Sequence, residues 1–553
     1  MNTESPIARP ENEPVLDYAP GSPEREELSR KLAEFKAQAA DIPLIIGGKE
    51  VRTGRTSPMI IPHDNQRTLG VFHKAGAAEV QLAIDAANAA RKSWAATPWR
   101  ERAAIFQKAA ELLAGPWRQT LNAATMLCQS KTPHQAETDA VCELADHYRF
   151  NPYYLQQIVS DQPPSPAGEK NILEYRPMEG FIFALTPANF TSIAGNLPTA
   201  PALMGNTVIW KPASTAVFSA WQLMKLWRAA GLPDGVINMV PGPGGEVGNC
   251  AIDSPDFGGL HFSGSTPVFN TFWTAISRNL YKYKHYPRIV GETGGKGFIF
   301  AHASCDPAAL KCALIRGAFE YQGQKRSAAS RAYIPRSLWN GIKDDLVAQI
   351  NGIKMGPCED FSCFMNAVID KSSYDSIKGH IALAKRDPDA KILAGGVCDE
   401  SQGYFIRPTL IETLNPQYRT MREEIFGPVL TVFVYEDDKF AETLKICDET
   451  SPYALTGSVF ARDKDAINEA SARLADAAGN FYINDKPTGA VVNRQPFGGG
   501  RASGTNDKVG WPHNLLRWTT VRTIKENLAP PADYRYPYMR SGFGEGKLKL
   551  AGK

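Results

Sequence analysis

The sequence predicts an α/β protein with two domains of the nucleotide-binding type, and three observations favour this class. The chain has 553 residues, too many for one ordinary hydrophobic core. Two regions, residues 181–240 and 296–461, show short apolar runs that alternate with segments of helical periodicity, which is typical of β-α-β units in a parallel sheet. A glycine-rich segment, residues 242–248, follows an apparent strand, as phosphate-binding loops do.

The individual elements are predicted in chain order from their own patterns. Residues 1–40 begin polar and proline-rich and become helical over 24–38, so we expect an arm on the main body without a functional role. Helical spacing of apolar residues predicts long amphipathic helices over 80–113 and 120–153. The first series of strands is expected at GFIFAL (180–185), NTVIW (206–210) and GVINMV (235–240), and the second at GFIFAH (297–302), SRAYIP (330–335) and PVLTVFVYE (428–436), with helices over 307–321 and 338–350.

The domain organisation is predicted to be discontinuous. After the second series, FYIND (481–485) and a glycine-rich stretch indicate that the chain returns to its first domain. The expected parts are an N-terminal arm (1–40), a cofactor-binding domain that includes the oligomerisation strands (41–295 and 460–525), an α/β domain of the catalytic type (296–459) and a C-terminal tail (526–553).

Composition argues for an enzyme of small molecules. The 61 basic and 58 acidic side chains nearly balance, which leaves no large field for nucleic acid or an anionic membrane. No stretch approaches the roughly 18 to 20 apolar residues that cross a bilayer. The nine cysteines are scattered without paired spacing, so neither disulfides nor a metal site is expected. Because the first residues are acidic and lack an apolar core, we expect a cytoplasmic protein, with the mitochondrial matrix as the alternative.

The glycine-rich segment 242–248 is a weak signal by itself, because its spacing departs from G-x-G-x-x-G and a simple turn explains it equally well. Six further motifs are more specific. They occur in the order TPANF (186–190), WKPAS (210–214), FSGST (262–266), GETGGK (291–296), EEIFGP (423–428) and QPFGGGRASG (495–504).

Together these motifs resemble the aldehyde dehydrogenase superfamily, from about residue 12 to residue 526. The stretches AGNLPTAPALMGN, FYINDKPTG and RASGTNDK are most similar to its glutamate-semialdehyde (1-pyrroline-5-carboxylate) dehydrogenases. The resemblance implies a Rossmann-like cofactor domain, an α/β catalytic domain and a small oligomerisation element, assembled as a homo-oligomer, at least a dimer.

The resemblance also implies a dinucleotide site for NAD, with NADP as the alternative. Lys211 and Glu424 match the residues that bind ribose hydroxyls, since an ammonium donates hydrogen bonds and a carboxylate accepts them. Ser265 matches a hydroxyl at a helix N-terminus near the pyrophosphate, Phe426 matches a ring near the nicotinamide ribose, and Gly245 lies in the glycine-rich loop. For Lys211 alone, the alternative is a solvated surface lysine.

The implied substrate is a small aldehyde or imine that carries a carboxylate. In the family, an asparagine amide stabilises the oxyanion and a glutamate activates water, roles matched by Asn189 and Glu292. The remaining matches are the substrate residues. Ser327, Gly489 and Ala490 match a loop that anchors the α-carboxylate, Phe190 and Phe497 match two flanking rings, and Glu137 matches a carboxylate near the substrate amino group. Core packing is the alternative for the two rings, and a solvated helix face is the alternative for Glu137.

One position departs from the family pattern: Arg326 stands where the resemblance places the catalytic cysteine. Arginine stays protonated and has no lone pair to attack an aldehyde, so Cys-dependent oxidation is predicted to be lost. Cys312, expected to be a packed core thiol, and Ser327, which has no evident base, are poor substitutes. A buried Arg326 needs a carboxylate, and Glu292 is expected to pair with it and so cease to act as a base.

Three interpretations of Arg326 stay open from the sequence. The chain is a pseudoenzyme that still binds NAD and serves as a scaffold or regulator, or an enzyme with a changed reaction in which Arg326 holds a carboxylate or polarises a carbonyl or imine for non-covalent hydride transfer. The changed reaction would fit a specialised biosynthetic pathway. In the third interpretation, the arginine is an isolated engineered or erroneous substitution in a conventional dehydrogenase, or activity survives by another route.

Overall fold

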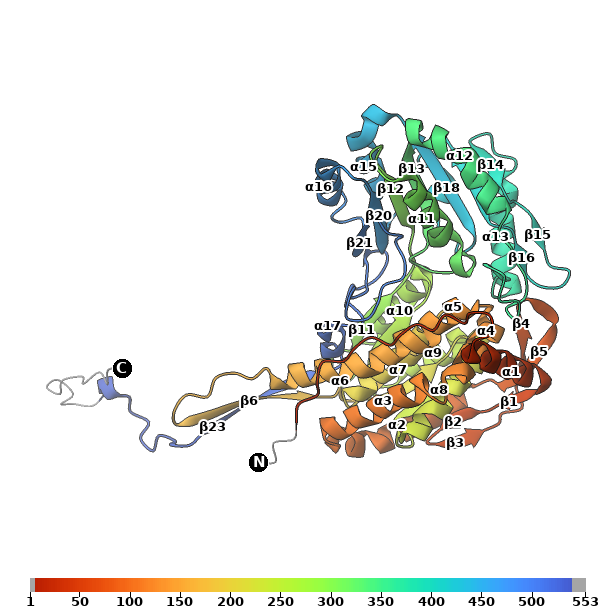
Figure 1. Cartoon of the computed structure of the whole chain (residues 1–553). Coiled ribbons are helices and arrows are strands. Elements are labelled where there is room, and N and C mark those ends of the chain that lie inside the picture. Colours follow the sequence, from red (N-terminus) through yellow and green to blue (C-terminus); the bar gives the residue numbers. More distant parts are fainter. Residues whose placement is uncertain (1–4, 540–553) are drawn as a thin grey trace.

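Two seven-stranded sheets organise the chain, whose computed structural model describes residues 5–539 (Figure 1). The first sheet has the order β11-β10-β7-β8-β9-β2-β3, and its five strands β7 to β11 are parallel. Its strands are β2 (Leu44–Ile46), β3 (Lys49–Val51), β7 (Phe181–Leu185), β8 (Thr207–Lys211), β9 (Ile237–Met239), β10 (Phe257–Ser263) and β11 (Arg288–Glu292). The strands predicted in this region are therefore confirmed.

Helices cover the first sheet because its strands are apolar on both faces, as parallel sheets require. They are α2 (Ala77–Ala96), α3 (Trp99–Ala114), α7 (Thr191–Leu203), α8 (Val217–Ala230), α9 (Gly244–Asp253) and α10 (Thr266–Arg278). The predicted helix over 80–113 is two helices, since Pro98 lies between them and disfavours helical backbone at the residue before it.

The predicted helix over 120–153 is interrupted. It consists of α4 (Arg118–Gln129), α5 (Pro133–Ala136), a π-helical segment (Glu137–Glu143) and α6 (Leu144–Ser160). Ser130 ends α4 in the left-handed region, with a φ of 57°. A π-helical turn inside a helix is often found at functional sites, and residues of this one line the cavity described below.

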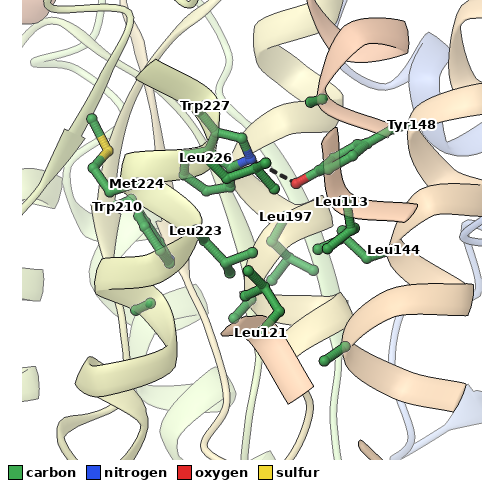
Figure 2. Close-up of a cluster of buried hydrophobic side chains, with 14 of the residues drawn as sticks. Leu113, Leu121, Leu144, Tyr148, Leu197, Trp210, Leu223, Met224, Leu226 and Trp227 are labelled. Carbon is green, nitrogen blue, oxygen red and sulfur yellow. Dashed lines mark hydrogen bonds between the residues drawn. The ribbon is translucent and has the colours of Figure 1, made fainter. Parts of the chain in front are cut away.

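A large apolar core joins these helices to the sheet. Figure 2 shows leucines of α8 packed against leucines of α4, α6 and α7, with Trp210 and Trp227 beside them. The rings of the two tryptophans lie 5.0 Å apart, and the indole N–H of Trp227 donates to the Tyr148 hydroxyl over 2.7 Å. The Trp227 N–H and the Tyr148 hydroxyl are thus hydrogen-bonded to each other inside an otherwise apolar environment.

The second sheet has the order β14-β17-β18-β13-β12-β20-β21 and is parallel except for β14. Its strands are β12 (Gly297–Ala301), β13 (Ala329–Pro335), β14 (Ala390–Ala394), β17 (Thr409–Thr413), β18 (Val429–Tyr435), β20 (Thr456–Phe460) and β21 (Asn480–Ile483). Its helices are α11 (Pro307–Phe319), α12 (Arg336–Asn351), α13 (Lys371–Ala384), α14 (Arg419–Arg422), α15 (Phe440–Glu449) and α16 (Lys464–Arg473).

The predicted domain boundary near residue 460 is too early. Strand β21, which contains the first residues of FYIND, pairs in parallel with β20 and so extends the second sheet. The chain returns towards the first domain only after Ile483, where residues 484–519 run back to α17 (Pro512–Leu516), which contacts α6.

Two peripheral features complete the fold. The N-terminal arm contains α1 (Pro23–Ala37), which buries Leu28 and Leu32 against the first core, and β1 (Ala40–Ile42), which pairs with the hairpin β4 (Thr56–Ile61) and β5 (Asp64–His73). Strands β6 (Glu169–Arg176) and β23 (Thr520–Asn527) form a two-stranded ribbon that projects from the body (Figure 1). The predicted tail lies partly outside the described residues, and no helix within them is long and apolar enough to span a membrane.

Candidate functional site

The predicted cofactor residues gather where the parallel strands of the first sheet end. Lys211 is the last residue of β8, and its register partner on β7 is Leu185. Glu292 is the last residue of β11 and pairs with Ser263 of β10. Because these strands are parallel, their carboxyl ends form one edge, which is where ligands bind in open α/β sheets.

Lys211 is buried with a side-chain environment that fits a ligand. Only 7% of the residue is exposed, so a solvated surface lysine is excluded. Burial lowers the pKa of Lys211 to about 8. The single hydrogen bond of its ammonium within residues 5–539 goes to the Pro212 carbonyl at 3.2 Å, which leaves donors free for ribose hydroxyls.

Glu424 lies beside the GETGGK loop that follows β11. One carboxylate oxygen accepts a hydrogen bond from the Gly295 backbone N–H over 2.8 Å, and burial raises the pKa of Glu424. A Cβ at position 294 would lie 2.7 Å from the other carboxylate oxygen, so glycine is needed there for this close approach. Phe426 follows in a left-handed conformation with a φ of 57°, a backbone strain that is often found at functional sites.

Two helix N-termini point towards the same region. Ser265 is the N-cap residue of α10, and its side chain makes no capping hydrogen bond. Thr266, next to it, accepts a hydrogen bond from the Gly294 N–H over 3.1 Å, which ties this helix end to the GETGGK loop. Gly245 lies in the first turn of α9, where an added Cβ would meet open space.

Arg326 lies on a buried loop between α11 and β13. Tyr321, Gln322 and Gly323 all adopt positive φ angles, which makes the backbone turn sharply before position 326. The Gln322 side chain holds this turn, since its amide donates to the carbonyls of Ser130 and Ala367 at 2.9 and 2.8 Å. The loop is therefore a fixed support for whichever residue occupies position 326.

The expected ion pair of Arg326 is present. Its guanidinium donates to one oxygen of Glu292 over 3.0 Å and to the Thr293 carbonyl over 3.4 Å, and only 7% of Arg326 is exposed. Burial raises the pKa of Glu292, and the Arg326 charge opposes that rise. The second oxygen of Glu292 has no hydrogen-bond partner within residues 5–539.

A cavity of about 500 Å³ opens above this pair. Arg326 and Glu292 form one part of its wall, and the predicted substrate residues form another. The Ser327 hydroxyl lies 2.8 Å from the Thr488 hydroxyl, and Gly489 has a φ of 94°, which favours glycine. The cavity is lined by the predicted residues Phe190, Glu292, Arg326, Ser327, Gly489, Ala490 and Phe497, and further by His134, Asp139, Ile193, Asn196, Lys325, Lys486 and Thr488 among others.

Phe190 is positioned by a buried charge cluster. The Lys131 ammonium lies 4.2 Å from the centre of the Phe190 ring and 4.5 Å from that of Tyr321, within the range of cation–π attraction. Lys131 pairs with Asp139 at 2.5 Å. Asp139 also accepts the backbone N–H groups of Thr191 and Ser192, the first residues of α7. Lys131 and Asp139 thus fix the Phe190 ring, which is part of the cavity wall, next to the N-terminus of α7.

The comparison with known proteins identifies the scaffold. The Aldehyde dehydrogenase family profile matches residues 50–524, most of the chain. The chain belongs to the aldehyde dehydrogenase family. Its relatives include a mitochondrial delta-1-pyrroline-5-carboxylate dehydrogenase of Dictyostelium discoideum, 53% identical over 536 residues that make up 96% of each protein. The human mitochondrial protein of the same name is 47% identical, with 96% of this chain and 94% of the human protein covered.

Solved structures agree with this assignment. The delta-pyrroline-5-carboxylate dehydrogenase of Mycobacterium tuberculosis, in a crystal structure bound with NAD, matches 98% of this chain and all of that chain at 50% identity and a TM-score of 0.94. The 1-pyrroline-5-carboxylate dehydrogenase of Thermus, also bound with NAD, matches 95% of this chain at 30% identity and a TM-score of 0.87. The predicted aldehyde dehydrogenase fold is therefore confirmed.

Two of the residues predicted for catalysis or substrate binding in this family member do not line the cavity. Asn189 is buried, and its amide donates to the Gln324 carbonyl over 3.0 Å, two residues before Arg326. Glu137 is fully buried, which excludes the solvated helix face, and it is absent from the cavity wall, so its match to a substrate carboxylate stays a prediction. Burial opposes its charge, but Arg118, together with the Leu16 N–H and the Tyr18 hydroxyl, lowers the pKa of Glu137.

Several residues at the site were missed from the sequence. Asn12 and Glu13 of the arm line the cavity, held by hydrogen bonds of Asn12 and of the Glu13 N–H to Asp146, both over 2.7 Å. The arm was expected to lack a functional role because polar, proline-rich sequence carries no signal of where it docks. Cys312, expected in the core, is instead exposed on α11 and does not line the cavity beside Arg326.

Proposed function

We propose that this chain binds NAD and a small carboxylate-bearing aldehyde or imine of the 1-pyrroline-5-carboxylate class, and that Arg326 prevents Cys-dependent oxidation of it. The observation that carries the proposal is the ion pair between Arg326 and Glu292 in the wall of a preformed cavity. A guanidinium occupies the nucleophile position, and the candidate base is neutralised by it.

The cofactor side supports dinucleotide binding. Lys211 is buried and Glu424 is half-buried, and neither has a charged side-chain partner among the ion pairs of residues 5–539. Ribose hydroxyls would satisfy both, since the ammonium donates and the carboxylate accepts. NAD, when bound, supplies the hydride acceptor. Its presence in two related crystal structures favours NAD over NADP as the cofactor of this chain.

The substrate side supports a carboxylate-bearing ligand. The backbone at Gly489 and Ala490 and the hydroxyl of Ser327 also border the cavity, and N–H and O–H donors are able to hold an anion. Phe190 and Phe497 border the same space and would exclude water from the aliphatic part of the ligand. The relatives named for 1-pyrroline-5-carboxylate support this substrate class.

Oxidation through a covalent intermediate needs groups that the site lacks. Arg326 has no lone pair, so no thiohemiacetal forms, and Glu292 is held in an ion pair instead of being free to take a proton from water. Asn189 donates one amide hydrogen to the backbone of the same loop and is not among the residues that line the cavity. Binding and turnover are thereby separated in this chain.

A changed reaction is the second candidate. The Arg326 guanidinium carries five N–H donors, and within residues 5–539 it makes hydrogen bonds to two acceptors. The remaining donors could hold a substrate carboxylate or polarise an imine while hydride moves without a covalent step. A scaffold that binds NAD without turnover is the other alternative to oxidation.

Calorimetry combined with a turnover assay tests the proposal. Purified parent protein is titrated with NAD and then with glutamate as a carboxylate-bearing product analogue, and the Arg326→Ala variant serves as a control for the ion pair. We expect binding of both ligands and no NADH formation from glutamate semialdehyde. Absence of NAD binding would overturn the proposal, and cofactor-dependent conversion of a carboxylate-bearing imine by the parent alone would favour the changed reaction.

The homo-oligomer and the compartment stay predictions. The projecting ribbon of β6 and β23 exposes Val521 and leaves the edges of two strands available for a second copy, which supports at least a dimer. The cytoplasmic location expected from the first residues stands against relatives named as mitochondrial, so cell fractionation would decide between the two compartments.

A further inference from the structure

His63, Cys358 and Glu359 form a compact cluster, and none of them lines the cavity beside Arg326. His63 lies in the turn between β4 and β5, and the other two residues lie in the loop between α12 and α13. His63 is 3% exposed and Cys358 is fully buried. Tyr404, which precedes β16, links the two segments, since its N–H donates to the Pro62 carbonyl of the hairpin and its carbonyl accepts the N–H of Val368 in the loop.

The distances within the cluster suit a tetrahedral metal ion. The ring nitrogen Nε2 of His63 lies 3.0 Å from Oε2 of Glu359 and 3.8 Å from the Cys358 sulfur, and that sulfur lies 3.5 Å from the same oxygen. A tetrahedral zinc ion with bonds of about 2.0 Å to N and O and about 2.3 Å to S separates its ligand atoms by about 3.3 to 3.6 Å. The three atoms therefore need to move by only a few tenths of an ångström.

We propose that His63, Cys358 and Glu359 bind one zinc ion, with water as the fourth ligand. Thiolate, imidazole and carboxylate are the side-chain ligands that zinc takes in proteins. A second cavity of about 500 Å³ is bordered by His63, Glu359 and Lys36 and supplies solvent for the open position. On binding, the thiol proton of Cys358 leaves to the buffer and the sulfur–metal bond replaces the thiol contact with Glu359.

The surrounding charges are compatible with a structural ion. Lys36 of α1 pairs with Oε1 of Glu359 at 2.5 Å, which leaves Oε2 directed at His63 and Cys358. Thiolate and carboxylate together neutralise a divalent cation, and the Lys36 charge remains near solvent. The ion would connect hairpin β4–β5 with the loop of the second domain, while the pair between Lys36 and Glu359 attaches α1 to the same point.

A hydrogen-bonded triad without metal is the competing explanation. In that case Nε2 of His63 carries a proton and donates to Glu359, the thiol donates to the same carboxylate, and Nδ1 has no hydrogen-bond partner within residues 5–539. Metal binding instead requires a neutral ring with its proton on Nδ1 and its Nε2 lone pair directed at the ion.

Cobalt substitution distinguishes the two explanations. Full-length protein is stripped with a chelator, dialysed and titrated first with Zn²⁺ and, separately, with Co²⁺. We expect about one equivalent of either ion per chain and a thiolate-to-cobalt charge-transfer band that Zn²⁺ abolishes. Cys358→Ser should lose the band and bind Zn²⁺ at least about 100-fold more weakly. Cys363→Ser, in the same loop but outside the three-residue cluster, should behave like the parent.

A second variant separates loss of zinc binding from failure to fold. Glu359 is partly exposed, so Glu359→Gln is expected to fold even if Cys358→Ser does not, and it should weaken Zn²⁺ binding while leaving NAD binding unchanged. A parent protein that gives no charge-transfer band overturns the proposal. A band that disappears in Cys363→Ser but persists in Cys358→Ser overturns it as well, because the thiolate would then belong to another site.

Discussion

Replacing Arg326 with cysteine is expected to create aldehyde dehydrogenase activity. Loss of a covalent nucleophile lowers turnover by about 10⁶-fold in an enzyme where it has been measured, which corresponds to about 8 kcal/mol of transition-state stabilisation. The loop that carries position 326 is held independently of Arg326 by the Gln322 side chain, so a cysteine should occupy a prepared place. We therefore expect Arg326→Cys to exceed the parent by about 10⁴- to 10⁶-fold.

The substitution also changes Glu292. Burial raises the pKa of Glu292, and the charge and hydrogen bond of Arg326 are the main opposing influences. Removing the guanidinium should raise that pKa further towards neutrality and free the carboxyl group to act as a base. In the Arg326→Cys background, Glu292→Gln is expected to release about one NADH per subunit in a burst and then stop, because the thioester is not hydrolysed.

The assay follows NADH absorbance with glutamate semialdehyde and NAD under identical conditions for each protein. Arg326→Ala is the matched control, since it frees Glu292 without providing a thiol, and it should stay near the parent rate. Calorimetry with NAD establishes that all variants bind the cofactor comparably. Parent turnover within tenfold of Arg326→Cys would refute our reasoning, and so would equal rates for Arg326→Ala and Arg326→Cys.

Two further predictions concern buried charges. Burial lowers the pKa of Lys211 to about 8, so the ammonium, which is the form that donates to ribose, is lost as the pH rises through 8. NAD affinity measured by calorimetry should therefore fall between pH 7 and pH 9. The Lys211→Met variant should bind NAD more weakly, and its affinity should depend less on pH. Glu137→Ala leaves Arg118 with Glu13 as its remaining carboxylate, so we expect the free energy of urea unfolding to drop by about 3 kcal/mol while NAD affinity stays within twofold. A glutamate affinity that fell more than tenfold in Glu137→Ala would show instead that Glu137 serves the substrate.

The sequence predicted the elements well because local periodicity determines them. The apolar runs around Phe181 and Phe298 became central strands, and Pro98 was visible as a breaker although its effect was not used. The sheet to which β21 belongs was not predictable in this way, because a strand's neighbour depends on long-range pairing. The motifs located the cofactor edge because some of their glycines lie where the backbone approaches another group closely, as Gly294 does beside the Glu424 carboxylate.

Side-chain partners across the fold were much harder to predict. Glu137 looked like a surface or substrate carboxylate because its partner Arg118 lies 19 residues earlier on another helix, and the arm that completes its hydrogen bonds carries no docking signal. The same limit hid the pairing of Lys131 with Asp139 beneath Phe190 and the approach of His63 to Cys358 across 295 residues. The Arg326–Glu292 pair could be predicted only because a buried guanidinium requires a carboxylate and the motifs brought one near.

The Arg326–Glu292 ion pair changes what the retained family residues indicate about function. Glu292 balances the buried charge of Arg326, so its presence follows from stability alone and is no sign of catalysis. Lys211 and Glu424 differ, because Lys211 is buried and Glu424 is half-buried, neither has an ion-pair partner within residues 5–539, and their desolvation disfavours folding. A fold gains nothing from such groups unless a ligand satisfies them. The cofactor edge therefore argues for retained NAD binding more strongly than the catalytic motif argues for retained oxidation.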